Sequence, residues 1–218
     1  MVLPTPFSTA APLVASFTFA ELASGTGFIR VYGYDTIDDT TTTLSLGEQV
    51  VFSQNQETSM SPNLTGTSGT FAKVADLDFD LSVFNSSRTL RGTAHITLAY
   101  AIGGTGGDTE SYIIARLQKW DGSTETSIAT TQTPTLAFSG STVTELANMN
   151  IIVPETHFAY GETLRLTLEH WGKYTGGATA NTGITVAHSP KNADGTTITV
   201  ANTGTTQLIL DAPFKIER

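Results

Sequence analysis

Residues 150–172 read Asn-Ile-Ile-Val-Pro-Glu-Thr-His-Phe-Ala-Tyr-Gly-Glu-Thr-Leu-Arg-Leu-Thr-Leu-Glu-His-Trp-Gly, a pattern typical of two β-strands around one turn. From Leu164 to Leu168, leucines alternate with polar residues, which is the period-two pattern of a strand with one buried face. Pro154 and Gly161 interrupt the segment, as these residues do at strand edges and turns. The same alternation returns along most of the chain and predicts an all-β protein.

The composition fits such a protein. Threonine accounts for 39 of the 218 residues and glycine for 20, which suits strands with β-branched outer faces joined by tight turns. Only 14% of the residues are charged, so neighbouring copies of the chain would repel each other weakly. A chain of this length is commonly one domain with one core. We therefore expect a single antiparallel β-sandwich of about ten strands with little or no helix.

The expected strands are the segments in which apolar residues alternate with polar ones or run together with β-branched residues. They are 14–22, 27–36, 49–53, 77–83, 90–100, 111–120, 125–131, both halves of 150–172, 182–188 and, after a turn at 191–195, a last pair of strands of which 208–216 is the second. The first two are expected to form a hairpin. Between strands, we expect an acidic loop at 35–43, an exposed excursion at 54–70, a hairpin tip at 103–107 and a connection at 133–142.

The charge balance excludes some partners. The formal net charge is −9 and the isoelectric point is near 4.7, whereas nucleic acids and anionic membranes reward lysine and arginine. We therefore expect neither as a partner. The absence of cysteine excludes disulfides and thiolate chemistry. The first residues carry no basic region and no sustained apolar run, so we expect synthesis in a cytoplasm without a signal peptide.

Residues 1–13 differ from the rest of the chain, which is expected to form the sandwich domain over residues 14–218. Pro4, Pro6 and Pro12 favour an extended arm, with Phe7 between them as an apolar contact. Such an arm could contact a neighbouring subunit or a shell beneath the domain. The alternative is a start of the chain without fixed structure.

Three carboxylates line one face of an expected strand, because Asp76, Asp78 and Asp80 alternate with apolar residues. Neighbours on one face of a strand lie about 7 Å apart, too far to hold one cation without a second strand or loop. We therefore expect a solvated face and not a metal site. Arg91 of the following strand would neutralise the row if the two strands pair.

No motif for catalysis is visible, and we predict no enzymatic activity and no cofactor. The four histidines share no short metal-binding spacing, and none lies beside a nucleophile elbow. His95 is expected on an outward strand face. His157, His170 and His188 are expected at strand ends or in loops. We expect structural roles for all four. Three glutamates could in principle supply a glycosidase pair, but sequence spacing does not set the separation that this chemistry needs. They are Glu155, Glu162 and Glu169.

Three aromatic residues are candidates for a contact surface: Trp120, Trp171 and Tyr174. Trp171 is out of phase with the leucines before it, which places it on the outer face or in a loop beginning at Gly172, and Trp120 ends its strand beside a turn. Exposed tryptophan and tyrosine can stack on sugar rings. They are also enriched at subunit interfaces, which is the alternative that we favour.

The segment from Ile151 to Leu168, a strand ending at His188 and the closing run from Leu208 to Ile216 resemble jelly-roll structural proteins of tailed bacteriophage particles. The run from Phe84 to Ile96 is similar to the middle strands of that group. The resemblance implies a jelly-roll capsid decoration or cement protein on the capsid surface, usually a trimer. Its partners would be the major capsid protein or other virion proteins. A carbohydrate-binding module, lectin-like or on a phage tail, is the competing prediction.

Overall fold

The computed structural model describes residues 26–38, 41–48, 57–60, 69–105, 107–176, 181–188 and 208–215. All regular structure in these residues is β-strand, and no helix there is long and apolar enough to cross a membrane. The strands are β1 (Thr26–Asp38), β2 (Thr41–Gly47), β3 (Glu57–Met60), β4 (Ala72–Leu81), β5 (Arg88–Thr105), β6 (Asp108–Trp120), β7 (Glu125–Gln132), β8 (Leu136–Phe138), β9 (Val143–Phe158), β10 (Thr163–Gly176), β11 (Asn181–Ala187) and β12 (Ile209–Lys215). The all-β prediction is confirmed, with twelve strands in place of about ten.

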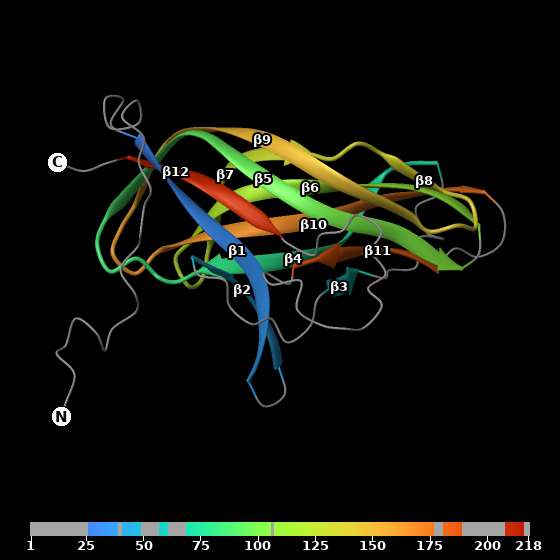
Figure 1. The fold of residues 1–218 in the computed structure, drawn as a ribbon, viewed down its shortest axis with the longest axis horizontal. Coiled ribbons are helices and arrows are strands. Elements are labelled where there is room, and N and C mark those ends of the chain that lie inside the picture. Colours follow the sequence, from blue (N-terminus) through green and yellow to red (C-terminus); the bar gives the residue numbers. More distant parts are fainter. Residues whose placement is uncertain are drawn as a thin grey trace.

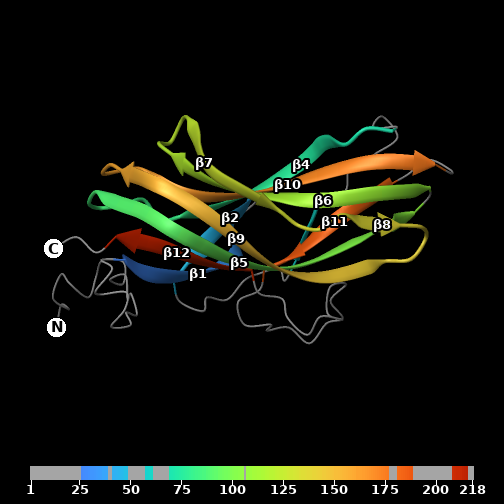
Figure 2. The same cartoon turned by 90° about the horizontal axis from the view of Figure 1, so that it is seen from above.

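The strands form two layers of a jelly roll (Figure 2). One layer has the order β1–β12–β5–β9 and the other the order β4–β10–β6–β7. Successive strands from β4 to β6, and again from β8 to β11, pass from one layer to the other, as in a jelly roll. The layers join through β2, which pairs with β1 and makes a short parallel contact with β4. The sheet is therefore mixed, although every other pairing in the described strands is antiparallel.

Strands β11 and β12 lie end to end along the same side of β5. The first pairs with residues 99–105 and the second with residues 90–97. Where they meet, the backbone oxygen of Leu208 accepts a hydrogen bond of 2.9 Å from the amide of Gly33. A Cβ atom on Gly33 would lie 2.7 Å from the Leu208 side chain, so any larger residue here would force that side chain to shift.

The core lies between the layers and consists of the inward residues that alternation predicts. Leu164, Leu166 and Leu168 are buried on β10, and their counterparts on β12 are Leu210, Ala212 and Phe214. Burial of this apolar surface is the main favourable term in folding, at about 25 cal/mol per Å². The expected Ile216, at the end of the closing run, lies outside the described residues.

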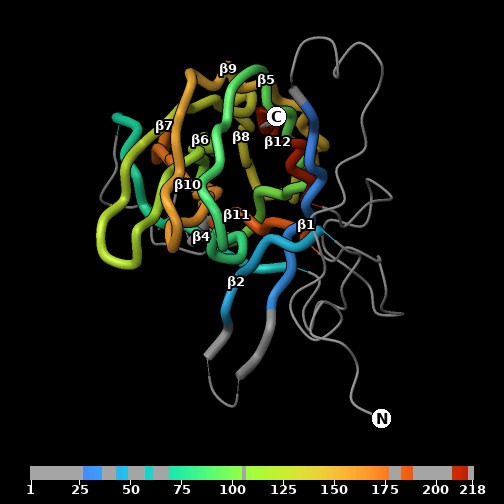
Figure 3. The backbone as a smooth tube through the Cα atoms, turned by 90° about the vertical axis from the view of Figure 1, so that its left-hand side faces the viewer, coloured from blue at the N-terminus to red at the C-terminus, as the bar shows by residue number. Residues whose placement is uncertain are grey.

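Several expected connections are strands instead. The partner of β1 in its hairpin is β2, which replaces the expected acidic loop, because β-branched threonines keep this segment extended. The outer half of this hairpin projects from the sandwich (Figures 1 and 3). The expected excursion at 54–70 contains β3, the connection at 133–142 contains β8, and β5 continues into the glycine-rich tip. The expected strands at 14–22 and 49–53 lie outside the described residues.

Candidate functional site

The outer face of the β4–β10–β6–β7 layer carries a ladder of paired charges. Its centre is formed by three residues of β10 that point outward yet are almost covered by neighbouring side chains. Arg165, Thr167 and Glu169 are only 9%, 2% and 6% exposed. Charged and polar groups with so little access to solvent need bonding partners. Each of these three side chains has one partner on β4 and another on β6 or β7.

Arg165 forms the first step of this ladder. Its guanidinium makes a two-pronged contact with Asp80, with Nε to Oδ1 at 2.6 Å and Nη2 to Oδ2 at 2.7 Å. Nη1 donates to Glu125 at 2.5 Å, and the indole ring of Trp120 lies 4.2 Å from the guanidinium carbon. The hydrogen bond with Asp80 is the main influence that raises the pKa of Arg165. This cation therefore links β4, β10 and β7.

Thr167 and Glu169 continue the ladder. Thr167 donates to Asp78 at 2.6 Å and accepts from the amide of Gln118 at 2.8 Å. Burial raises the pKa of Asp78. The carboxylate of Glu169 accepts from the side chains of Arg116, Lys73 and Trp171, at 3.0–3.3 Å. Burial opposes ionisation of Glu169, but these hydrogen bonds outweigh it and lower its pKa.

The row of Asp76, Asp78 and Asp80 is neutralised by Lys73 and by Arg165 of β10, and the strand pairing that would have let Arg91 neutralise it does not form. Strand β4 pairs with β10 and β2 and not with β5. Arg91 lies in the other layer, 3.1 Å from Glu155. Within the described part of the chain, no group of three or more histidine, aspartate and glutamate side chains could hold a metal ion.

The predicted aromatic residues do not form one cluster. Trp171 lies on the outer face, as alternation predicts, but β10 continues through Gly172 where a loop was expected. Trp171 pairs with Tyr112, and their rings lie parallel with centroids 6.3 Å apart. Trp120 is eight residues from Tyr112 along β6, which is about 26 Å. Tyr174 pairs with the inward-facing Thr109, so it belongs to the opposite face from Trp171.

Two aromatic residues that the sequence interpretation missed complete the group around Trp171. The ring of Phe71 lies 4.9 Å from that of Tyr112, and the ammonium of Lys173 lies 4.7 Å from the Phe71 ring. Alternation along β6 could have identified Tyr112 as outward-facing, since Ser111 and Ile113 on either side point inward. Nothing local marks Phe71, because its place depends on the β4–β10 pairing. We call these three residues and Lys173 the aromatic patch.

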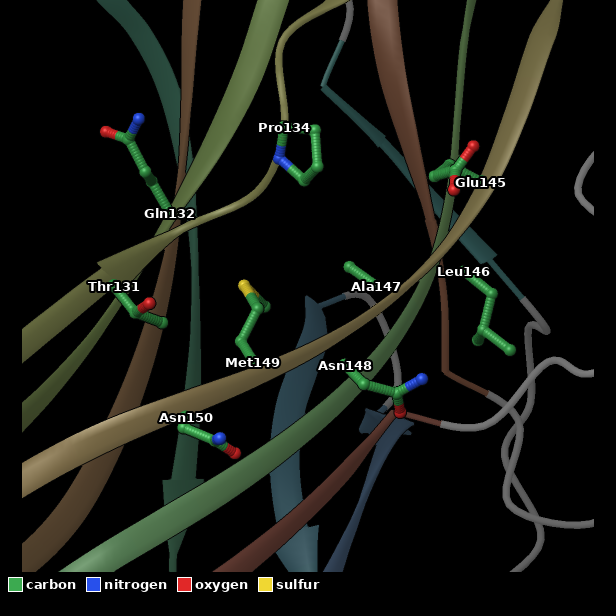
Figure 4. A pocket seen from close by; sticks show the side chains of 9 residues that line it. All are labelled: Thr131, Gln132, Pro134, Glu145, Leu146, Ala147, Asn148, Met149 and Asn150. Carbon is green, nitrogen blue, oxygen red and sulfur yellow. The ribbon is translucent and has the colours of Figure 1, made fainter.

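A groove opens between the two layers where their edge strands approach each other (Figure 4). Its volume is about 330 Å³. The lining comes from the end of β7, the following turn and the first half of β9: Thr131, Gln132, Pro134, Glu145, Leu146, Ala147, Asn148, Met149 and Asn150. These side chains comprise three amides, four apolar residues, one threonine and one glutamate.

The four histidines lie in different parts of the sandwich, and each contacts a different polar side chain. His95, on the outward face as expected, contacts Asn150 at 2.7 Å, and His157 near the end of β9 contacts Thr89 at 2.9 Å. The expected position of His170, at a strand end or in a loop, is wrong, because this residue lies within β10 and faces the interior, 3.0 Å from Ser111. His188 follows β11 and contacts Thr58 at 2.8 Å. Burial lowers the pKa of both buried imidazoles to about 4.

The serine–histidine contact is closed to substrates. Ser111 and His170 are both 0% exposed, whereas a nucleophile and its base must reach a bound substrate. The three glutamates do not converge either. Glu162 pairs with Lys119 in the turn before β10, Glu155 pairs with Arg91, and Glu169 belongs to the ladder. The arm residues Pro4, Pro6, Phe7 and Pro12 lie outside the described residues.

The fold is similar to a part of several solved hydrolases. An α-amino acid ester hydrolase is 9% identical with a TM-score of 0.51, over 86% of this chain and 36% of that one. An aminopeptidase from the marine sediment archaeon Thaumarchaeota archaeon is 6% identical with a TM-score of 0.50, over 88% and 37%. A CocE/NonD family hydrolase from Staphylococcus aureus is 13% identical with a TM-score of 0.48, over 88% and 37%.

This chain thus spans little more than a third of the length of the hydrolases that it matches. At these identities, the likeness shows the fold alone. No protein-family profile and no curated protein matches the chain.

Proposed function

We propose that this protein is a non-enzymatic structural component of a virus particle, a capsid decoration or cement protein on the outer shell. The observation that carries the proposal is the charge ladder on the β4–β10–β6–β7 face. Its charged groups are bound to one another across the four strands of this layer and do not surround a reactive pocket. A face without a reactive pocket favours a role in contacts with other proteins.

A decoration protein needs many modest contacts that symmetry repeats over the shell. The low content of charged residues reduces repulsion between adjacent copies. The partners would be the major capsid protein or other virion proteins, and the arm at residues 1–13 would contact the shell or a neighbouring subunit.

Co-sedimentation tests this proposal. The purified chain should sediment with undecorated capsids of its own virus, and a variant that lacks residues 1–12 should bind more weakly while keeping its fold. Fully decorated capsids, whose sites are occupied, are the control. If the intact chain stays in the supernatant with undecorated capsids, the decoration role is refuted.

The absence of enzymatic activity is a separate part of the proposal. A fluorophosphonate probe labels activated serines, and we expect it to leave the native chain unlabelled because Ser111 and its imidazole partner are buried. Labelling that disappears in Ser111→Ala would make the protein a hydrolase and overturn this part.

Carbohydrate binding is the second candidate, and the aromatic patch is the observation that favours it. Parallel rings on adjacent strands offer apolar faces on which a sugar ring can stack, and the ammonium of Lys173 adds a polar donor beside them. The test is a glycan array with the purified chain. Binding that Trp171→Ala abolishes and Trp120→Ala preserves would support this function, since Trp120 is engaged by Arg165 outside the patch.

A further inference from the structure

Strand β9 is a long edge strand whose outer side has no strand partner among the described residues. It pairs with β5 alone, in unbroken register from Val143 to Val153, and a bulge follows. The groove between the layers runs beside residues 145–150 and keeps this side open (Figure 4). An edge of this kind presents a row of backbone donors and acceptors that can pair with another strand.

This edge lacks the usual protection against pairing. Residues 146–154 contain no charged side chain, although edge strands are commonly blunted by charges. Pro154, which could also block pairing, lies beyond the regular segment. Two large apolar side chains on the outer face of the strand are left in solvent, Leu146 at 39% and Ile152 at 83%. An unpaired strand edge with exposed apolar side chains beside it is typical of a site that binds another strand.

We propose that a second copy of this chain covers it, through antiparallel pairing of β9 with β9 about a twofold axis at Met149. In this register, Leu146 lies opposite the partner's Ile152, so the two exposed apolar side chains cover each other. Asn148 lies opposite the partner's Asn150, which places amides face to face. Cross-strand neighbours of this kind are the pairs that stabilise a sheet.

The register follows from the sequence of the strand itself. Met149 is the midpoint of residues 145–153, which lie within the regular part of β9. A shift of two residues in one direction would place Glu145 opposite the partner's Glu155. The opposite shift would leave Leu146 facing the partner's Asn150. Of these three registers, only the one centred on Met149 places Leu146 opposite Ile152 and keeps these like charges apart.

The pairing would form about nine backbone hydrogen bonds, one for each residue of the paired segment. It would join the β1–β12–β5–β9 layers of two copies into one continuous sheet. This inference does not depend on the proposed decoration role. It predicts twofold symmetry, whereas the resemblance to phage proteins implies three copies.

Light scattering after size-exclusion chromatography tests the inference on the full chain. The expected mass is about 46 kDa, twice the 23.1 kDa of one chain. A trimer, or a monomer that persists at about 100 µM, would overturn the pairing.

A matched pair of variants tests the register. Leu146→Lys/Ile152→Lys places like charges opposite each other and should weaken the dimer at least about tenfold in Kd. Leu146→Lys/Ile152→Glu places opposite charges in contact across the interface and should remain dimeric. Within one chain, the two positions are six residues apart, about 20 Å, so they do not interact directly. Circular dichroism confirms the folding of both variants.

A further control is Tyr160→Lys, which introduces the same charge at an exposed site outside the paired segment and should leave the dimer unchanged. If both double variants behave alike, or if the control also dissociates the dimer, the proposed register is wrong.

Discussion

Acid should destabilise this protein through His170 and His188. Both imidazoles are buried in the sandwich, and burial lowers the pKa of each from 6.5 to about 4. The buried carboxylate of Asp35 favours the charged form of His188, but burial outweighs it. Between pH 6.5 and pH 4, the unfolded chain therefore binds protons that the folded chain does not. The free energy of unfolding must fall as the pH falls through this window.

The size of the effect follows from the two pKa values. A shift of 2.5 units corresponds to about 3.4 kcal/mol for each histidine once the pH is below both values. Between pH 7 and pH 5, only part of this is lost, about 2 kcal/mol for each residue and about 4 kcal/mol for the pair. Ordinary carboxylates have pKa values near 4, so they change little over this interval.

Urea denaturation at pH 7 and pH 5 measures the effect. In His170→Gln/His188→Gln, glutamine can keep the hydrogen bonds to Ser111 and Thr58 but cannot titrate, so the dependence on pH should nearly vanish. The matched control is His95→Gln, at an exposed histidine, which should retain the dependence of stability on pH. The reasoning is refuted if the free energy of unfolding of the native chain falls by less than about 1 kcal/mol between pH 7 and pH 5, or if the double variant shows the same fall.

Three further predictions concern stability, each checked by urea denaturation at pH 7. Arg165→Met removes the cation shared by Asp80 and Glu125 and should lower the free energy of unfolding by about 3 kcal/mol. The control is Arg91→Met, which removes an exposed ion pair and should change that free energy by no more than about 0.5 kcal/mol. Gly33→Ala should cost about 1–3 kcal/mol, because its Cβ would overlap the Leu208 side chain; the added Leu208→Ala should remove this overlap penalty, and full additivity of the two costs would contradict it. Leu166→Ala should cost about 2–5 kcal/mol by leaving a cavity between the layers, and a cost below about 1 kcal/mol would contradict its place in the core.

Much of the local structure follows from alternation along the chain. The inward leucines of β10, the end of β6 at Trp120 and the outward face of Trp171 were all predictable, because successive side chains of a strand point to opposite faces. The errors lie where alternation is weak or where elements run longer than their apolar signal. The threonine-rich β2 and the three-residue β8 are examples, since neither carries a strong apolar pattern.

The candidate site was predictable only in part. The face occupied by Asp76, Asp78 and Asp80 is clear from the sequence, but their partner Arg165 lies some 85 residues away. Arg91, the nearer candidate, is in the other layer. A chain carries no local signal for which of several strands will be its neighbour, since pairing depends on how the whole sandwich closes.

The sequence by itself determined that this is an all-β protein and which face of most strands is buried, because both follow from a local period of two residues. The tertiary structure alone decided that β11 and β12 share one side of β5 and that the serine–histidine contact is sealed in the core. It also decided that, among the described strands, β9 pairs only with β5. These features depend on contacts between segments far apart in the chain. No local pattern of residues encodes such contacts.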